Sequence, residues 1–162
     1  MNRTSSPARR LTILGAFVLS LTCQLVWALE NDAFSFGIGG TKPVLWKEYE
    51  PLTKSLGACM KDNQWDSPTC RRVQDQSMQM MNDAILQAVM LNVNIQNSSE
   101  KFCDKTSTDL VRKHESGQLT AYAFLLVEKR LKYGAGLYGA RLPETYLGKI
   151  VFDALRDESP CK

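Results

Sequence analysis

The chain has 162 residues, of which 20 are lysine or arginine and 17 are aspartate or glutamate. Three arginines and no acidic residue lie in the first 28 residues, so residues 29–162 carry 17 basic and 17 acidic side chains. This formally neutral body of 134 residues is long enough for one domain with its own core. It lacks the excess of positive charge with which proteins bind nucleic acid or anionic membranes, and we therefore expect neither as a partner.

The first 28 residues are typical of a secretory signal peptide. Three arginines precede an apolar stretch over residues 11–26, and a small residue, Ala28, ends the segment. The apolar stretch is shorter than the ~20 residues of a membrane-spanning helix, which makes an uncleaved anchor the lesser alternative. The sequence therefore predicts cleavage of residues 1–28, export to the periplasm, and no membrane span in the mature chain.

The mature chain begins with a glycine-rich segment. Residues 29–45 combine several glycines with Phe34 and Phe36, a pattern that disfavours a helix. We expect an extended arm whose aromatic side chains pack on a helical domain spanning residues 46–162.

Apolar residues at helical spacing begin at Trp46 and predict a first helix over residues 46–62. Its apolar stripe consists of Tyr49, Leu52, Leu56 and Met60. Ser67 followed by Pro68 is typical of an N-cap and a first helical residue, and the second helix is predicted to run from there to about Asn94.

The second predicted helix is apolar on more than one side and is expected at the centre of the fold. It contains a cluster of four methionines, Met78, Met80, Met81 and Met90. At helical spacing these favour a core lining, and an adaptable binding surface is the alternative.

Further helices are predicted near residues 107–115, over 119–133 and over 143–157. The last has Ile150 and Val151 on its apolar face, and its other face carries Glu144, Lys149, Asp153 and Arg156. No segment shows the sustained alternation of a strand. The sequence predicts an all-α fold, a small bundle of about five helices.

Four cysteines remain once Cys23 leaves with the signal peptide, and in an exported domain an even set favours two disulfides. Cys59 lies near the end of the first helix and Cys70 in the first turn of the second, so a bond between them would clamp the helical hairpin. Cys103 and Cys161 would then close the C-terminal half. We prefer this pairing, although the spacing also allows the other two connectivities.

Residue types that carry out catalysis or bind metals are sparse. His114 is the single histidine and lies in a charged segment, and the cysteines lack the close spacing of a metal site. Residues 134–139 match the dinucleotide motif G-x-G-x-x-G, but a predicted helix rather than a strand precedes them. We expect a flexible hinge there, and no catalytic residue, metal or cofactor in the protein.

The same glycine-rich segment contains candidate partner-binding residues. Tyr133 and Tyr138 flank Gly134 and Gly136, and Gly139 follows. Exposed aromatic side chains on a mobile loop favour contact with a protein, whereas packing of the two tyrosines on the core is an equal alternative.

The cysteine layout resembles that of the Rap/Tai family of periplasmic immunity proteins, which neutralise peptidoglycan amidase effectors of type VI secretion. The likeness lies in Cys59 and Cys70, in Phe102-Cys103, in the Ile-Val-Phe-Asp-Ala-Leu segment of residues 150–155, and in Ser159-Pro160-Cys161. This resemblance implies a small helical fold that binds a toxin tightly, blocks its active-site cleft and performs no chemistry.

Three kinds of partner follow from these observations. The first is a toxin or effector, bound by an immunity-type inhibitor. The second is an unfolding client, bound by a periplasmic stress chaperone. The third is an envelope secretion or conjugation apparatus, which the protein would join as an accessory subunit by inserting its arm over residues 34–38. A second copy of the chain, giving a homodimer, is a further alternative.

Overall fold

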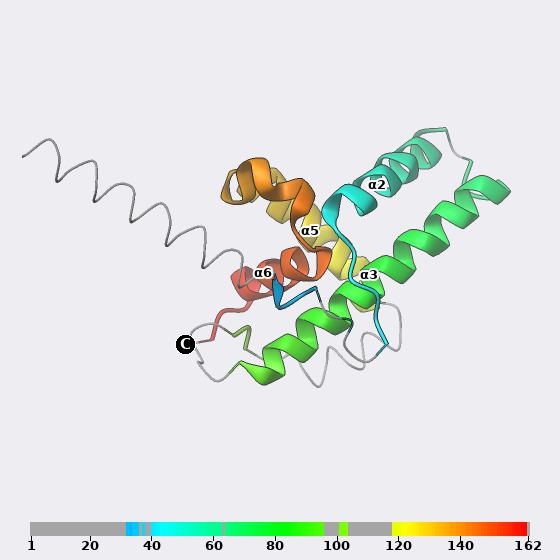
Figure 1. Cartoon of the computed structure of the whole chain (residues 1–162). Helices are drawn as coiled ribbons and strands as arrows, with labels where there is room; N and C mark the ends of the chain where they lie inside the picture. Colours follow the sequence, from blue (N-terminus) through cyan, green and yellow to red (C-terminus); the bar gives the residue numbers. More distant parts are fainter. Residues whose placement is uncertain are drawn as a thin grey trace, which may run out of the picture.

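The fold is all-α, as the sequence predicts. The computed structural model describes residues 32–35, 37, 40–62, 64–95, 101–103 and 118–161. These contain α2 (Trp46–Lys61), α3 (Pro68–Asn94), α5 (Gln118–Tyr138), the 3-10 helix η2 (Gly139–Glu144) and α6 (Leu147–Glu158), and no strand (Figure 1). The helix predicted near residues 107–115 lies outside the described residues. Within the described ranges, none of the helices combines the length and the apolar character that crossing a bilayer requires.

The boundaries of the first two helices follow their local sequence. The N–H of Leu45, just before α2, donates to Glu48 Oε2 at 2.8 Å. Ser67 caps α3, because its hydroxyl oxygen accepts from the Cys70 N–H at 3.2 Å, and Pro68 begins the helix. Each acceptor satisfies a backbone donor that has no partner inside the helix.

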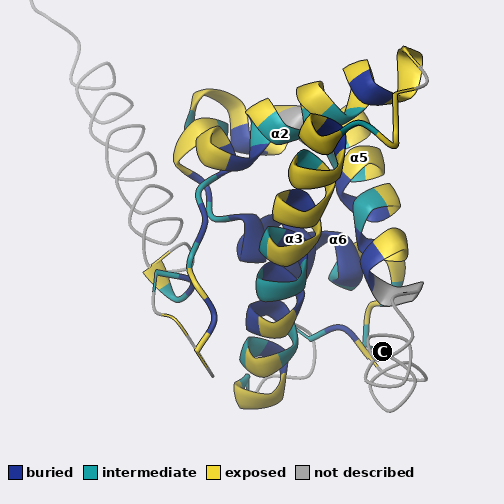
Figure 2. Cartoon of the chain, turned by 90° about the vertical axis from the view of Figure 1, so that its right-hand side faces the viewer, coloured by how far each residue is buried: buried dark blue, intermediate teal, exposed yellow. Residues whose placement is uncertain are grey.

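The helices α3 and α6 form the centre of the molecule. Helix α3 packs against α2, α5 and α6, which confirms its predicted central position. Helix α6 is more completely enclosed, since every residue over 147–155 is buried (Figure 2). Lys149 and Asp153, predicted on the polar face of the last helix, are therefore buried as well.

The segment before α2 packs on the helices through Phe34, as predicted for the aromatic side chains of the arm. The ring of Phe34 is buried, with its centroid 6.0 Å from that of Phe152 on α6. Further along, the Leu147 N–H donates to the Val44 carbonyl at 2.8 Å. This approach leaves no room for a side chain at Gly148, where a Cβ would lie 2.9 Å from Phe34 Cδ1 and 2.6 Å from Gln87 Oε1.

Both preferred disulfides are confirmed. Cys59 is bonded to Cys70 across the α2–α3 hairpin, with the Cα atoms 5.9 Å apart. Cys103 is bonded to Cys161, and beside this bond the Cys103 N–H donates to the Ser159 carbonyl at 2.8 Å. By loop-closure entropy the short loop contributes about 3 kcal/mol and the long one about 4 kcal/mol.

The predicted glycine hinge is wrong. Helix α5 continues through Gly134 and Gly136 to Tyr138, and the chain turns only at Gly139, where φ is +54°. Pro143 therefore lies in η2 rather than at the start of the last helix. Helix α5 extends past the glycines because Tyr138, at its end, is anchored in the core.

Candidate functional site

A large apolar groove lies between α2, α3 and α5. Its volume is about 1030 Å³. The side chains that line it are predominantly apolar, and several are aromatic or methionine. They are Trp46, Tyr49, Thr53, Leu56, Gly57, Met60, Trp65, Gln74, Ser77, Met78, Met81, Thr120, Ala121, Phe124, Leu125, Val127, Glu128, Leu131 and Lys132.

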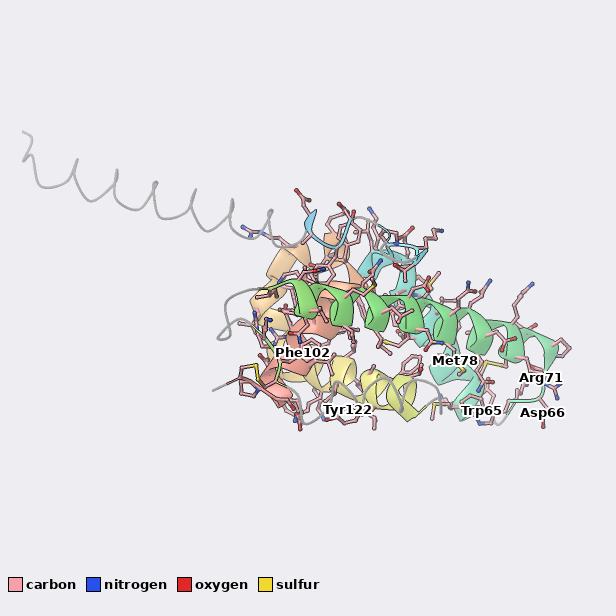
Figure 3. All side chains as sticks on the ribbon, turned by 90° about the horizontal axis from the view of Figure 1, so that it is seen from below. Trp65, Asp66, Arg71, Met78, Phe102 and Tyr122 are labelled. Atoms are coloured by element: carbon pink, nitrogen blue, oxygen red, sulfur yellow. A yellow bond between two sulfur atoms is a disulfide. The ribbon has the colours of Figure 1, made fainter. Side chains whose placement is uncertain are left out.

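The groove forms because two helices share one support. Helices α2 and α5 both pack on α3, and the rings of Tyr49 and Phe124 meet with their centroids 6.3 Å apart. Towards the hairpin end, Met60 on α2 and Trp65 in the loop after it line the groove. Figure 3 shows Trp65 and Met78 towards that end and Phe102 towards the other. The Cys59–Cys70 bond holds the two helices of the hairpin together there.

Apolar side chains remain exposed on the walls of the groove. Met60 is 62% exposed on α2, Leu125 is 64% exposed on α5, and Trp65 and Met78 are each more than a third exposed. Contact with water is unfavourable for such surface by about 25 cal/mol per Å². A cluster of this kind is typical of a binding surface.

The methionine cluster is divided between the core and the surface. Met81 is fully buried and forms part of the core, as predicted. Met78 instead lines the groove, and Met90 is exposed elsewhere on α3. The stripe of α2 divides in the same way, with Tyr49 in the core and Met60 on the groove wall.

Few polar groups line the groove. Among the described residues that line it, the ionisable side chains are those of Tyr49, Glu128 and Lys132. The hydroxyls of Tyr49 and Ser77 are buried without a hydrogen-bond partner among the described residues, and burial raises the pKa of the Tyr49 phenol. The described lining of the groove can therefore bury apolar surface of a partner.

A second, smaller cavity lies between α5 and α6. Its volume is about 390 Å³, and it contains two of the predicted partner-binding residues, Tyr133 and Gly134. Tyr133 is 77% exposed and Leu137 is 71% exposed, so apolar surface is available at this end of α5 as well.

Tyr138 does not belong to that exposed surface. It is 5% exposed and packs in the core, which is the alternative that the sequence left open for it. Burial and the nearby Asp153 carboxylate both raise the pKa of its phenol. Gly136 and Gly139 are exposed, on α5 and η2. The structure thus separates the predicted set into an exposed Tyr133 and an internal Tyr138.

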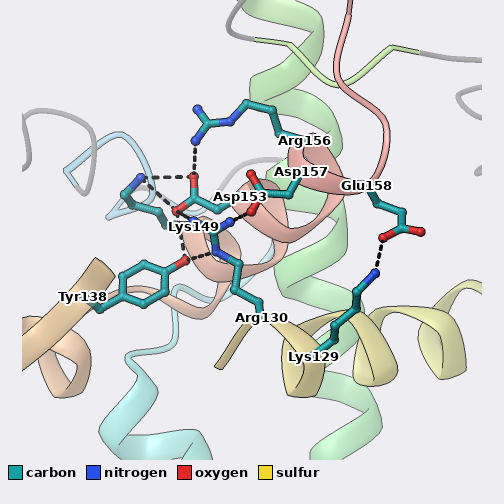
Figure 4. Close-up of polar contacts among 8 residues, drawn as sticks. All are labelled: Lys129, Arg130, Tyr138, Lys149, Asp153, Arg156, Asp157 and Glu158. Atoms are coloured by element: carbon teal, nitrogen blue, oxygen red, sulfur yellow. Dashed lines mark hydrogen bonds and ion pairs between the residues drawn. The ribbon is translucent and has the colours of Figure 1, made fainter. Parts of the chain in front are cut away.

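A buried cluster of charges surrounds Asp153 (Figure 4). Its carboxylate accepts from Lys149 Nζ at 3.3 Å, from Arg156 at 3.2 Å and from the Tyr138 hydroxyl at 3.0 Å. Arg130 on α5 donates to the Tyr138 hydroxyl oxygen at 3.0 Å and pairs with Asp157. These contacts tie α5 to α6, and because each charged group has a polar partner, the cluster stabilises the packing of the two helices.

Sequence reasoning missed this cluster, although one signal was present. Lys149 and Asp153 are four residues apart and can therefore pair on one helix face. What the sequence does not give is that Arg130 and Tyr138, from another helix, cover this face. No group of three or more histidine, cysteine, aspartate or glutamate side chains among the described residues is arranged to hold a metal ion.

Comparison with known proteins gives no match: no family model fits the chain, and neither the curated proteins nor the solved structures contain one that does.

Proposed function

We propose that the protein is a binding protein of the periplasm, which holds a partner protein by burying an apolar segment of it in the groove. The observation that carries this proposal is the open cluster of Met60, Trp65, Met78 and Leu125 between three helices. Two disulfides suit a protein that works in an oxidising compartment outside the cytosol.

The mode of binding that fits this surface is a helix in a groove. The described residues contain no strand whose edge could pair with an extended peptide. On α5 the groove extends from Thr120 to Lys132, about 18 Å at 1.5 Å per residue. A partner helix of about three turns would span that length with apolar residues at positions i, i+4 and i+7.

The partner we favour is a toxin directed at peptidoglycan, neutralised by an inhibitor that performs no chemistry of its own. The resemblance to the Rap/Tai immunity proteins supports this choice. The stapled hairpin supports it as well, since a wall held by Cys59–Cys70 is preformed and little conformational entropy is lost when a partner binds.

A periplasmic chaperone is the second candidate, and the methionines favour it. Met60 and Met78 present flexible, polarisable side chains, which adapt to many apolar sequences. The accessory-subunit alternative has less support, because Phe34 of the arm is buried against Phe152 and is not available for insertion into a partner.

The test of groove binding uses a charge placed in the groove. The mature chain and its Leu125→Asp variant are immobilised and exposed to periplasmic extract, with Val93→Asp as the matched control. Val93 is 72% exposed on α3 and does not line the groove. We expect a captured protein that Leu125→Asp loses and Val93→Asp retains. Equal capture by the two variants would contradict the proposal.

Acid distinguishes the two candidates. A chaperone activated by stress should loosen near pH 3 and bind a hydrophobic dye more strongly, with loss of its near-UV circular dichroism. An inhibitor with a preformed groove should keep both signals at their neutral-pH values. If the near-UV signal is lost while the helical far-UV signal remains, the inhibitor is excluded in favour of the chaperone.

A further inference from the structure

Methionine sulfurs are concentrated at the hairpin end of the groove. Met60 on α2 is 62% exposed, and Met78 on α3 is 39% exposed. Met81 also lines the groove, but it is fully buried. Met90 has nearly the same exposure as Met78, at 37%, and lies outside the groove. Among the described methionines, the groove thus has two exposed sulfurs and one shielded sulfur, while half-buried Met80 and exposed Met90 do not line it.

We propose that Met60 and Met78 are an oxidative modification site, whose conversion to sulfoxide closes the groove to apolar partners. This inference rests on the proposed function of the groove. The oxidant is hydrogen peroxide or another small two-electron oxidant that reaches an oxidising compartment.

The chemistry balances with peroxide alone. A lone pair of the thioether sulfur attacks one peroxide oxygen, the O–O bond breaks and an S–O bond forms. The sulfur loses two electrons, and the hydroxyl group that it has taken up gives its proton to the departing hydroxide, which leaves as water. Exposure governs the rate, so Met60, Met78 and Met90 react before Met81.

The product changes the groove where an occupant would touch it. A thioether is apolar and makes favourable contacts with aromatic rings, such as that of Trp65. A sulfoxide oxygen is a strong acceptor that loses its water when an apolar segment covers it. Among the described residues that line the groove, the cationic donor is Lys132, which belongs to the α5 wall and not to the α2–α3 side where Met60 lies.

The experiment follows the groove with the dye 1-anilinonaphthalene-8-sulfonate, using the mature disulfide-bonded chain before and after peroxide. Peptide mass mapping gives the oxidation of each methionine, and far-UV circular dichroism reports retention of the fold. Three variants are treated in parallel: Met60→Leu/Met78→Leu, Met90→Leu and Met60→Gln/Met78→Gln. Each is compared with its own untreated affinity, so that an effect of the substitution itself cancels.

We expect peroxide to weaken dye binding about tenfold in the native chain and in Met90→Leu, which is the effect of leaving a polar group unpaired at an apolar contact. Met60→Leu/Met78→Leu should keep its untreated affinity, and Met60→Gln/Met78→Gln should bind weakly without peroxide. Unchanged binding in native protein whose Met60 and Met78 are fully oxidised would overturn the inference. So would an equal loss in Met60→Leu/Met78→Leu.

Failure of the groove itself gives a different result. Dye that does not bind the untreated native chain, or that binds Leu125→Asp equally well, contradicts the proposed function before any oxidation. Loss of the far-UV signal together with oxidation of Met81 would mean that peroxide unfolds the chain, and that result also overturns a switch confined to Met60 and Met78.

Discussion

The ring of Tyr49 on α2 lies 6.3 Å from the ring of Phe124 on α5, and this contact joins the two helices that form the walls of the groove. Both helices rest on α3. The contact therefore fixes how far the walls stand apart at one end, while the Cys59–Cys70 bond holds the hairpin at the other.

Removal of the Phe124 ring should weaken the fold and widen the groove. Because Phe124 is half-buried, we expect Phe124→Ala to lower the free energy of unfolding by about 1–3 kcal/mol, measured by urea denaturation. The neighbouring Leu125 is mostly exposed, and Leu125→Ala should change the free energy of unfolding by less than about 0.5 kcal/mol. Equal losses in the two variants would show that Phe124 does not brace the walls.

The two disulfides should differ in what they support. Beyond Tyr49, the only buried residue of α2 is Cys59, and the only buried residue in the first two turns of α3 is Cys70. In Cys59→Ser/Cys70→Ser the free energy of unfolding should therefore fall by about 3 kcal/mol, and the groove should no longer bind the dye.

The matched variant is Cys103→Ser/Cys161→Ser. Its free energy of unfolding should fall by about 4 kcal/mol because of loop-closure entropy, and its folded fraction should still bind the dye. Unfolding midpoints and dye titration measure both effects. Retention of full dye binding in Cys59→Ser/Cys70→Ser would contradict a groove held open by the hairpin.

The same substitution should have opposite effects at two buried tyrosines. Tyr138 donates to the buried Asp153 carboxylate, so Tyr138→Phe leaves that carboxylate with one donor fewer and should destabilise the fold by about 1–3 kcal/mol. The Tyr49 hydroxyl has no partner among the described residues, so Tyr49→Phe should be neutral or stabilising by about 1 kcal/mol. Thermal unfolding at neutral pH measures the stability of both variants. Destabilisation in both would mean that the Tyr49 hydroxyl has a polar partner.

Two glycines should respond differently to a methyl group. Gly148→Ala would bring a Cβ against Phe34 and Gln87, and we expect a loss of about 1–3 kcal/mol. At Gly136 a Cβ meets nothing within 4 Å and the residue lies inside α5, so Gly136→Ala should stabilise by about 0.5–1 kcal/mol. If Gly136→Ala destabilises the protein instead, the helical course of α5 through this segment is contradicted.

Local signals carried most of what could be predicted from the sequence. Ser67-Pro68 determines where α3 begins through backbone capping, and Cys59 and Cys70 pair because the hairpin loop between their helices is short. Such features depend on neighbours in the chain, and these are visible in the sequence.

The buried charge cluster and the groove could not be predicted from the sequence, because they depend on how the helices pack against one another. Lys149 and Asp153 look solvated on a helical wheel, and they are buried because Arg130 and Tyr138 come over them from α5. The groove has the same origin, since the apolar stripe of α2 is covered by other described helices at Tyr49 but not at Met60. Periodicity predicts an apolar face but does not reveal whether another helix of the chain lies on it.

The most direct test of the account is site-specific photocrosslinking in living cells, with a photoreactive phenylalanine analogue at Leu125 in the groove, at Tyr133 beside the smaller cavity, or at Val93 on α3. All three positions are more than 60% exposed, so they accept the probe equally well. The account predicts one discrete crosslinked protein from Leu125 and none from Val93. A discrete product from Tyr133 or Val93, with none from Leu125, would contradict it.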